Sequence, residues 1–575
     1  MVKKIELEGK RRLLDEERES QGELSFSVKN IPSKPEAWSQ LMTESSVRAE
    51  NLEDISKLST KEYLFHIDNL VRDVISSPDY RDESLFEPGK PGYISDAAWK
   101  KLVDGGLLLS ALGDRGEEGK QKEVMLITKI LSYYSLPLGL TYGIVGALGI
   151  LTIQSFVTDE EKRKNLLQII RDGQRVGLGI TEPERSGTQA LDMASEYEVF
   201  GDRVILNGVK HLQGNSLTGG LIVAAVKKGA SKKTVGFFFV PQELIDTRIT
   251  KTQGLSEITY GVNTFDNVEL SMDEHFMGEI SGMDLIEFQN IFTKSRLLFP
   301  GMLDGFTQRL VVESENLPER TKQVESVQAS MVKIKSWRLI VEAIFNSTAD
   351  NIDLENDNSG LVIEADIVKA LSSELSALSA LELAELNGGM SYYDDDQSAL
   401  NFFIDVYPFQ IFEGSQKFVY SQAAQLFLRG DRKIEPPILS FTKDQQTSFL
   451  EYYMIRIKDR VLFNGGFEVI DGELPRSIAN LEGDTVIALG KIKNESMSAG
   501  IYEQIGRILA WLYALGNINE VDASESQLLL TKKMINKKIR DLVGDYELAK
   551  DILSMISEQE QQELIAAGVV GMSRD

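Results

Sequence analysis

A long stretch without any charged side chain, from Ile130 to Thr158, leaves this chain few possible folds. The stretch is long enough to cross a membrane as a helix. However, it contains Pro137 and four small residues that allow close packing of backbones: Gly139, Gly143, Gly146 and Gly149. We therefore expect a buried pair of core helices here and no integral membrane span. The N-terminal residues lack the apolar segment of a signal peptide, so the cytoplasm is the simplest compartment.

The charge balance is strongly acidic, with 88 Asp and Glu against 62 Lys and Arg in 575 residues, a net charge of −26. Nucleic-acid binding depends on Lys and Arg that neutralise phosphates, so this balance argues against a nucleic-acid partner. The chain has no cysteine, which excludes disulfides and thiolate chemistry. With only three histidines in the chain, we expect no metal site.

The spacing of the hydrophobic residues divides the chain into five segments. Helical patterns cover 1–85, expected to be an N-terminal extension, and 86–175, expected to be a helical domain. An alternating pattern covers 176–282 and predicts a β domain. The helical pattern returns in 283–430 and continues through an additional segment, 431–575.

Local signals predict single elements inside these segments. "YEVFGDRVILNG" at 197–208 indicates a strand, a Gly-Asp turn and a second strand. Three more strands are expected at 221–228, 234–241 and 262–270. Helices are expected at 95–108, at 158–174 with Thr158 as N-cap, at 324–344 with one apolar stripe from Val324 to Ile344, and at 361–386.

Six short motifs follow this layout in order: "GLGITEPERSG" (177–187), "LNGVKHLQGNS" (206–216), "GFFFVP" (236–241), "GLSEITYGVNTFDNVEL" (254–270), "AELNGGMSYY" (384–393) and "IFEGSQ" (411–416). Together they resemble the acyl-CoA dehydrogenase family over residues 85–430. The resemblance implies a mainly α fold with a central β domain: a helical domain, a β-barrel-like domain and a four-helix bundle, here with an extra C-terminal helical domain. It also implies FAD between the β domain and the bundle, a homodimer or homotetramer, and an electron-transfer flavoprotein as partner.

Glu413 lies in "DVYPFQIFEGSQKF", eight residues after Asp405, and most of the residues just before it are aromatic or apolar. A carboxylate desolvated by such neighbours becomes a stronger base. By resemblance, Glu413 is the catalytic base that removes the α-proton of an acyl thioester, and its backbone N–H is part of an oxyanion hole. The alternative is a carboxylate at a helix N-terminus that backbone N–H groups satisfy. If Glu413 is not the base, Glu287 is the next candidate.

Other site residues are carried over from the same resemblance. Thr181 is expected at the flavin ring, with a simple turn residue as the alternative. Gly388 and Gly389 are expected where a partner subunit approaches FAD, with a helix C-cap as the alternative. Arg296 is expected near the adenine end of acyl-CoA, with a surface arginine as the alternative. The remaining assignments are Thr188 and Ser415 to the cofactor, and Ser186 and Gly414 to the substrate.

The sequence also departs from the family pattern. Gln213 replaces the usual threonine beside flavin N5, and His211 replaces an aromatic residue that shields the flavin. The family's Arg-x-x-Phe-Gly motif is missing, because "ENLPERTKQVESVQ" stands there with Arg320 at a shifted spacing. We therefore expect weaker or rearranged FAD binding.

These observations favour a soluble FAD-dependent enzyme that converts an acyl thioester into a trans-2-enoyl thioester. A second reading keeps the reaction but delivers the acyl group on an acyl carrier protein, which requires a local basic patch for this acidic partner. A third reading is a non-catalytic acyl-binding or assembly protein of the same fold.

Overall fold

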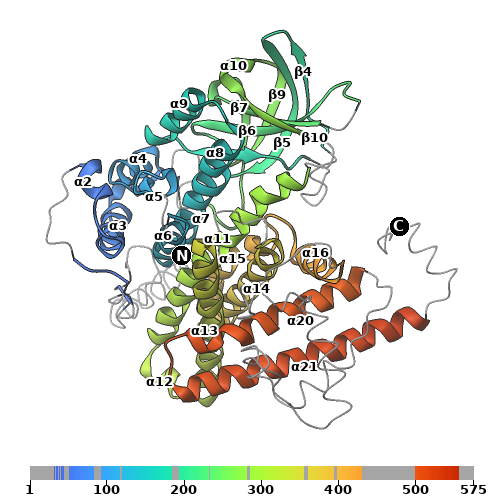
Figure 1. The fold of residues 1–575 in the computed structure, drawn as a ribbon. Coiled ribbons are helices and arrows are strands. Elements are labelled where there is room, and N and C mark those ends of the chain that lie inside the picture. Colours follow the sequence, from blue (N-terminus) through green and yellow to red (C-terminus); the bar gives the residue numbers. More distant parts are fainter. Residues whose placement is uncertain are drawn as a thin grey trace, which may run out of the picture.

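The computed structural model describes residues 32, 34–35, 38, 41–44, 51–82, 92–116, 120–183, 193–231, 234–281, 285–354, 361–393, 398–429 and 499–555. A sheet domain forms one end of the molecule and a helical bundle lies in the middle (Figure 1). The N-terminal helices pack on one side of the bundle, and the last two helices cross the end opposite the sheet.

The N-terminal part consists of helices α2 (Leu52–Ser56), α3 (Thr60–Ile75), α4 (Asp96–Asp104), α5 (Leu109–Leu112) and α6 (Lys120–Tyr134). Ser95 caps α4 by accepting the Ala98 N–H, as the sequence predicts. The side chains of α2 and α3 share one continuous hydrophobic core with those of α4 to α6. A boundary at residue 85 therefore does not separate two cores.

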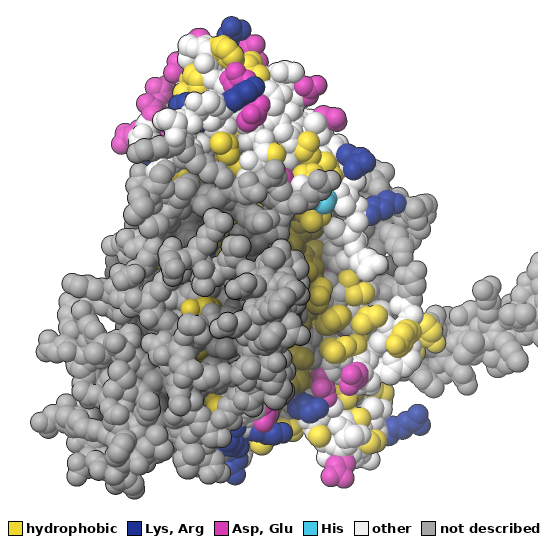
Figure 2. All heavy atoms as spheres, turned by 90° about the vertical axis from the view of Figure 1, so that its right-hand side faces the viewer, with side chains coloured by type: hydrophobic (Ala, Val, Ile, Leu, Met, Phe, Trp, Pro, Cys, Tyr) yellow, Lys and Arg dark blue, Asp and Glu magenta, His cyan; other side chains and the backbone are white. Residues whose placement is uncertain are grey.

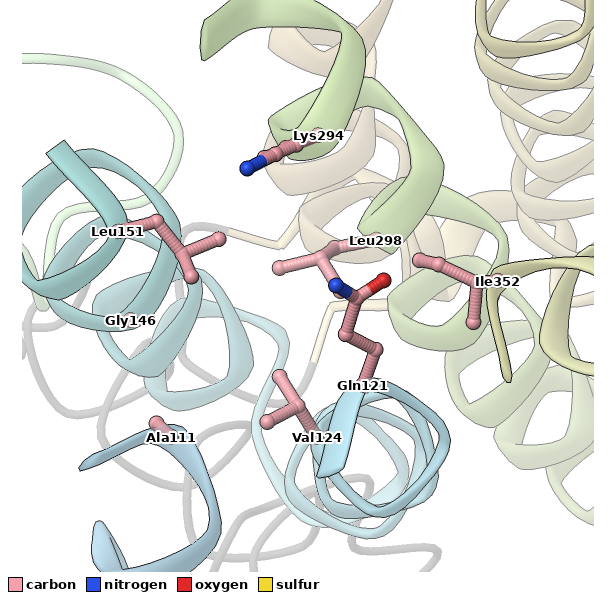
Figure 3. A pocket seen from close by; sticks show the side chains of 8 residues that line it. All are labelled: Ala111, Gln121, Val124, Gly146, Leu151, Lys294, Leu298 and Ile352. Atoms are coloured by element: carbon pink, nitrogen blue, oxygen red, sulfur yellow. The ribbon is translucent and has the colours of Figure 1, made fainter. Parts of the chain in front are cut away.

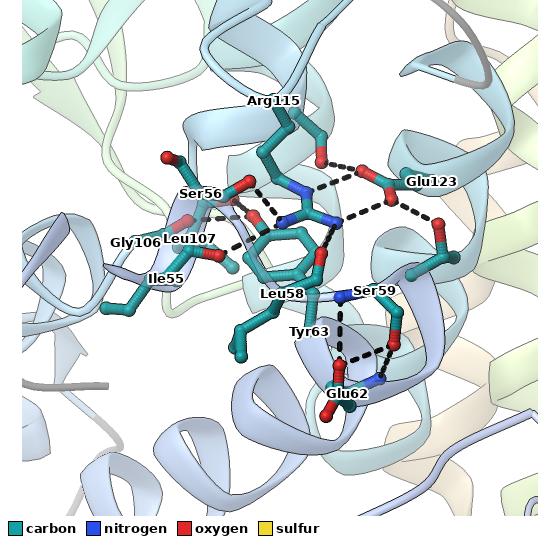
Figure 4. Close-up of polar contacts among 12 residues, drawn as sticks. Ile55, Ser56, Leu58, Ser59, Glu62, Tyr63, Gly106, Leu107, Arg115 and Glu123 are labelled. Carbon is teal, nitrogen blue, oxygen red and sulfur yellow. Dashed lines mark hydrogen bonds and ion pairs between the residues drawn. The ribbon is translucent and has the colours of Figure 1, made fainter. Parts of the chain in front are cut away.

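Arg115 connects separate segments of this helical layer (Figure 4). Its guanidinium donates to the backbone carbonyls of Ile55, Ser56 and Leu58 at 2.9 to 3.1 Å and pairs with Glu123. Because the guanidinium is almost fully buried, these bonds satisfy carbonyls at the end of α2 that water does not reach. The loop between α2 and α3 is thus fastened to α6.

The uncharged run forms one buried helix, broken from α6 at Ser135. It comprises α7 (Leu136–Gly143), a π-helical segment η3 (Ile144–Ile150) and α8 (Leu151–Phe156). Among the described residues this is the one helix long and apolar enough to cross a membrane, but 89% of its most apolar window is buried inside the protein. The prediction of buried core helices is therefore confirmed. Helix α9 (Glu160–Arg171) follows, capped by Asp159 and not by Thr158.

The sheet domain contains eight strands: β3 (Val176–Gly179), β4 (Glu196–Phe200), β5 (Arg203–Gln213), β6 (Gly220–Lys227), β7 (Thr234–Val240), β8 (Asp246–Thr250), β9 (Tyr260–Ser271) and β10 (Phe276–Ser281). Their order is β10-β7-β6-β4-β5-β9-β8, with β3 parallel to β6. The predicted strands are confirmed, and Gly201 makes the turn between β4 and β5 with φ +67°. A separate two-stranded sheet joins β1 (Arg81–Asp82) and β2 (Tyr93–Ile94). A short helix, α10 (Met272–His275), lies between β9 and β10.

Glu257 fastens the sheet domain to the N-terminal helices. Its carboxylate accepts hydrogen bonds from the Tyr80 and Ser135 hydroxyls, both at 3.1 Å, and pairs with Arg81. Its backbone carbonyl accepts the Ile94 N–H at 2.9 Å. One buried residue thus binds three separate segments of the helical layer.

The bundle is built from α11 (Leu285–Glu315), α13 (Glu325–Leu354), α14 (Val362–Leu386) and α16 (Gln416–Arg429). Shorter elements connect them: α12 (Glu319–Lys322), η8 (Gly388–Tyr392), α15 (Ala399–Val406) and η9 (Tyr407–Gln410). The predicted stripe on α13 is buried at Ile334, Val341 and Ile344, but Val324 is exposed. The helix therefore packs in the bundle through its C-terminal two-thirds.

The C-terminal part contributes α20 (Ala499–Asn517), a short η12 (Ile518–Glu520) and α21 (Glu525–Met555). Helix α20 packs along α16 and α14, and α21 packs on α20 and α13. At Gly506 the backbone of α20 touches the backbone of α16, because a Cβ there would collide with the Tyr420 carbonyl. The Tyr513 hydroxyl donates to the buried Glu364 carboxylate at 2.6 Å. The extension is thus part of the bundle core.

Candidate active site

Glu413 lies in a tight turn between η9 and α16. The Pro408 carbonyl accepts the N–H groups of Ile411 and Phe412, both at 2.9 Å, and the chain then turns through two left-handed residues. Glu413 has φ +55° and Gly414 has φ +106°. A left-handed conformation costs a residue with a side chain about 1 kcal/mol or more, so other contacts must hold Glu413 in place.

The Glu413 carboxylate points into the bundle. Its Oε1 accepts the hydroxyl of Ser295, on α11, and its Oε2 is shielded from solvent with no hydrogen-bond partner in the described part of the chain. Burial raises the pKa of Glu413 to about 7, and the Ser295 hydroxyl, Arg296 and Lys369 oppose only part of this rise. Among the described residues, no backbone N–H donates to this carboxylate. The alternative, a carboxylate satisfied by the N–H groups of a helix N-terminus, therefore does not describe Glu413.

Two buried cations hold the backbone of this turn. Arg296, on α11, donates to the Glu413 carbonyl from Nε at 3.1 Å and from Nη2 at 2.7 Å. Lys369, on α14, donates from Nζ to the Gly414 carbonyl at 2.7 Å. Arg296 also forms an ion pair with Asp366, one turn before Lys369 on α14. These bonds fix the left-handed turn.

The structure places Arg296 inside the bundle. Its side chain is only 8% exposed, so the alternative of a surface arginine does not describe it. Its donors bind Glu413, Asp366 and Gln422, and its assignment to the adenine end of acyl-CoA stays a prediction. The sequence did not reveal Ser295, Asp366 or Lys369 as neighbours of Glu413, because all three lie on helices distant in sequence.

The sheet domain meets the bundle at the same turn. The Tyr260 ring, at the start of β9, stacks on Phe412 with centroids 6.3 Å apart. The Leu255 N–H donates to the buried Asp405 carboxylate of α15 at 2.6 Å. Gly261, next to Tyr260, pairs with Gln213 of β5. Through this register, the end of β5 lies beside the Glu413 turn.

Thr181, His211 and Gln213 come together at this edge of the sheet. The Thr181 carbonyl accepts the His211 N–H at 2.8 Å and the Gln213 side-chain amide at 3.3 Å. Gln213 Nε2 also donates to the His211 carbonyl, and its Oε1 accepts from Asn263 at 3.1 Å. The amide of Gln213 is therefore used within the sheet domain. The flavin contacts assigned to the three residues stay predictions.

Glu182, next to Thr181, was not identified from the sequence. It forms a buried ion pair with Lys210 at 2.8 Å and accepts the Ser195 N–H at 2.9 Å. Burial opposes its charge, but the hydrogen bond from Lys210 and the Lys210 charge outweigh this and lower the pKa of Glu182 to about 2. The pair anchors the turn that presents Thr181.

The paired glycines lie at the end of α14. Gly388 has φ +55°, immediately after the helix, which is the geometry of a glycine C-cap. A Cβ at Gly388 or Gly389 would meet nothing within 4 Å, so there is open space beside both residues. Ser415 is exposed just before α16. Ser186 and Thr188 lie outside the described residues, and so does the side chain of Glu287.

Several features at the junction fit a flavin cofactor. The Glu413 N–H has no hydrogen-bond acceptor among the described residues, and the Glu413 Oε2 has no donor. The space beside Gly388 and Gly389 would admit a group close to the backbone. In contrast, the part of the chain that the structure describes contains no cluster of His, Asp and Glu that could hold a metal ion.

A small apolar pocket lies on the neighbouring face of α11 (Figure 3). Lys294 and Leu298, which flank Ser295 in sequence, line it from α11, and Gly146 and Leu151 line it from the buried helix. The opposite wall comes from α5, α6 and α13. The π-helical segment therefore borders a cavity together with α11, the helix that carries Ser295.

The helical layer, the sheet domain and the bundle, with the half-buried Glu413 at their junction, are arranged as in the acyl-CoA dehydrogenase fold. The chain is similar to an acyl-CoA dehydrogenase from Bacillus anthracis solved with FAD, at 17% identity, 92% coverage of each chain and a TM-score of 0.63. It is also similar to the prolyl acyl carrier protein oxidase AnaB, at 16% identity and a TM-score of 0.54, over 66% of this chain and 99% of that one. At these identities the likeness shows the fold.

A curated relative supports the resemblance drawn from the six motifs. The acyl-CoA dehydrogenase AFT10-1 of Alternaria alternata is 30% identical over 146 residues, which are 24% of this chain and 33% of the relative. The match thus spans about a third of the relative's length. No family model matches the chain. The likeness to the B. anthracis structure thus covers 92% of this chain, whereas the likeness to AnaB covers 66% of it.

Proposed function

We propose that this protein is an FAD-dependent dehydrogenase that converts an acyl thioester, in the first place an acyl-CoA, into a trans-2-enoyl thioester. The observation that carries the proposal is the Glu413 carboxylate. Its Oε2 is shielded from water and has no hydrogen-bond partner among the described residues, and burial raises its pKa to about 7 at the junction of the sheet domain and the bundle. The dehydrogenase fold of the chain supports the same assignment.

The residues of the site suit this chemistry. The α-proton of a thioester is very weakly acidic, and a desolvated carboxylate such as Glu413 is a stronger base than one in water. The free N–H of Glu413 would donate to the oxygen that gains negative charge as the proton leaves. A bound FAD supplies the acceptor for the β-hydride. Thr181, Gly388 and Gly389 are the described residues that would hold it.

The visible spectrum of the purified protein tests this proposal. We expect a yellow protein whose flavin bleaches when a saturated acyl-CoA is added without oxygen. A panel of acyl-CoAs of different chain length then defines the substrate. A colourless protein that FAD cannot reconstitute would contradict the proposal.

One observation favours a second substrate class, acyl groups on an acidic carrier protein. This reading requires a basic patch, and α21 carries one: Lys532, Lys533, Lys537 and Lys538 form no ion pair with described residues. Lys533 and Lys537 are exposed, beside the exposed Leu529 and Leu530. The same acyl chain offered on CoA and on a carrier protein distinguishes the two classes, because equal or faster turnover on CoA removes the second.

The surface of the bundle supports a homo-oligomer, which we also propose. Figure 2 shows hydrophobic side chains grouped on one face of the described part. The exposed apolar residues near the glycine pair and the Glu413 turn are Met390, Tyr392, Tyr393, Leu381, Tyr407 and Ile411, and Tyr392 is 87% exposed. Apolar side chains grouped in this way often mark a protein interface. The proposed acceptor of the electrons is an electron-transfer flavoprotein.

A further inference from the structure

The guanidinium of Arg296 binds the main chain of Glu413 and not its carboxylate. Nε and Nη2 donate to the Glu413 carbonyl, and Nη1 donates to Asp366 and, at 3.4 Å, to Gln422. An arginine this close to a carboxylate normally forms a two-pronged ion pair with it. Such a pair would make Glu413 a poor base, because a neighbouring cation stabilises the charged form.

Asp366 explains why the ion pair with Glu413 does not form. Its side chain is fully buried, its Oδ1 accepts from Arg296, and its Oδ2 has no partner in the described part. Asp366 therefore neutralises Arg296 on the side away from Glu413. The two remaining donors of Arg296 are left for the Glu413 carbonyl.

Lys369 adds a second cation to the same turn. It is fully buried, donates to the Gly414 carbonyl and lies 5.8 Å from the centre of the Phe299 ring. Burial, followed by the charge of Arg296, lowers the pKa of Lys369 to about 7. When it is charged, Lys369 favours the ionised form of Glu413 and so lowers the pKa of that carboxyl.

We propose that Asp366 and Lys369 are positioning residues that act in opposite directions on the basicity of Glu413. Asp366 raises the basicity by keeping Arg296 neutralised and bound to the carbonyl. Lys369 lowers it by placing a positive charge beneath the turn. This proposal rests on the proposed function, in which Glu413 is the base.

The other polar and charged groups around Glu413 differ from Asp366 and Lys369 in what they bind. On α11 the neighbours are Ser295 and Arg296, and on α15 the nearest carboxylate is Asp405, which binds the Leu255 N–H. From β9, the Tyr260 ring stacks on Phe412. On α16, Lys417 is exposed. Asp366 and Lys369 are thus the two charges on α14 that bind this turn or its arginine.

Two variants and a control test the proposal. Asp366→Asn keeps an oxygen for Arg296 and removes the negative charge, and Lys369→Met removes the positive charge with little change in volume. Asp304→Asn is the control, because Asp304 is an equally buried carboxylate on α11 that pairs with Lys129 at 2.7 Å. It lies eight residues from Arg296, about 12 Å along the helix.

The first readout is the pH dependence of flavin reduction by an acyl-CoA. We expect the acid limb to move down by about one pH unit in Asp366→Asn and up by a similar amount in Lys369→Met. Asp304→Asn should leave it unchanged even if the protein melts at a lower temperature. Shifts in the same direction for both variants, or none, would overturn the proposal.

The second readout is an infrared titration, which does not require the protein to be active as an enzyme. The infrared band of the protonated Glu413 carboxyl is obtained by subtracting the spectrum of the matching Glu413→Gln protein, for the wild type and for each variant. We expect its titration to move in the same two directions. If no acyl thioester bleaches the wild-type flavin, the proposed function fails, and this titration still decides between tuning of Glu413 and a purely structural cluster.

Discussion

At the scale of single residues, the backbone of the Glu413 turn shows how the site is maintained. A glutamate in the left-handed region is unfavourable by itself, and here Arg296 and Lys369 each bind a carbonyl of the turn. The carboxylate is consequently held in a direction in which water does not reach Oε2. The cost of this conformation is offset by the hydrogen bonds that Arg296 and Lys369 donate to the two carbonyls of the turn.

The role of Glu413 as base leads to the first prediction. Glu413→Gln keeps the size of the side chain and removes the base, so flavin reduction should fall by about 10²–10⁴-fold. FAD content should not change, because the amide adds no charge. Glu413→Asp should lose less activity, since the carboxylate survives one methylene short. Stopped-flow absorbance at the flavin band measures all three, and a wild-type rate in Glu413→Gln would show that the base lies elsewhere.

The raised pKa of Glu413 leads to a second prediction, on stability. The folded protein holds this carboxyl at a pKa of about 7, above the ordinary value of 4.5. Between these values the folded state binds more protons than the unfolded state, so this group makes the free energy of unfolding fall as pH rises. The Glu413→Gln variant lacks this penalty. It should therefore gain stability relative to the wild type between pH 5 and pH 8, by up to about 3 kcal/mol. Urea unfolding at both pH values measures the difference, and a constant difference would contradict it.

The aromatic neighbours of Glu413 and the family resemblance together singled out this residue in the sequence, and its role as base stays a prediction. Its partners could not be predicted, since Ser295, Asp366 and Lys369 come from two other helices and appear as ordinary polar residues in helical patterns. The contacts of Arg296 could not be predicted for the same reason. Nothing in "KSR" indicates that its guanidinium turns inward to an aspartate seventy residues away.

At the scale of elements, α20 and α16 contact each other backbone to backbone at Gly506. This gives a third prediction. Gly506→Ala should force the two helices apart and destabilise the protein by about 1–3 kcal/mol. Gly544→Ala on α21 is the matched control, because a Cβ there meets nothing within 4 Å and should stabilise the helix by up to about 1 kcal/mol. Thermal unfolding of the two variants compares them, and equal melting temperatures would contradict the close contact.

The elements were predictable where periodicity was strong. The strands β4, β5, β6, β7 and β9 alternate or are continuously apolar, and all five agree with the sequence. Strands β3, β8 and β10 were missed. Strand β3 is half glycine, β8 carries charged or polar residues at most positions, and β10 is short and interrupted by Gly278. The π-helical segment could not be found either, since every position of a fully buried helix is apolar whatever its period.

At the scale of the whole molecule, the exposed residues beside the glycine pair give a fourth prediction. If this face is an interface between copies, Tyr392→Glu should dissociate the oligomer, because it places a charge at an 87% exposed tyrosine that would become buried. Light scattering of the purified protein measures the mass. Lys100→Glu, on the exposed face of α4, serves as the control and should leave the mass unchanged. A monomeric wild type would contradict the interface.

The order of the domains could be read from the sequence, but not how they share their cores. The sheet strands fall within 176–282 as expected. The segment 431–575, in contrast, showed only a helical pattern, and the structure brings α20 into the core through Tyr513 and Glu364. Such contacts join positions about 150 residues apart, which local patterns do not reveal.

Glu257 has one further consequence, for how the sheet domain can move. It binds the sheet domain to Tyr80, Arg81 and Ser135, while Asp405 binds the same domain to the bundle through Leu255. The domain is thus tied on two sides through carboxylates. We therefore expect it to keep its position against both helical layers when a ligand binds, without a hinge motion between them.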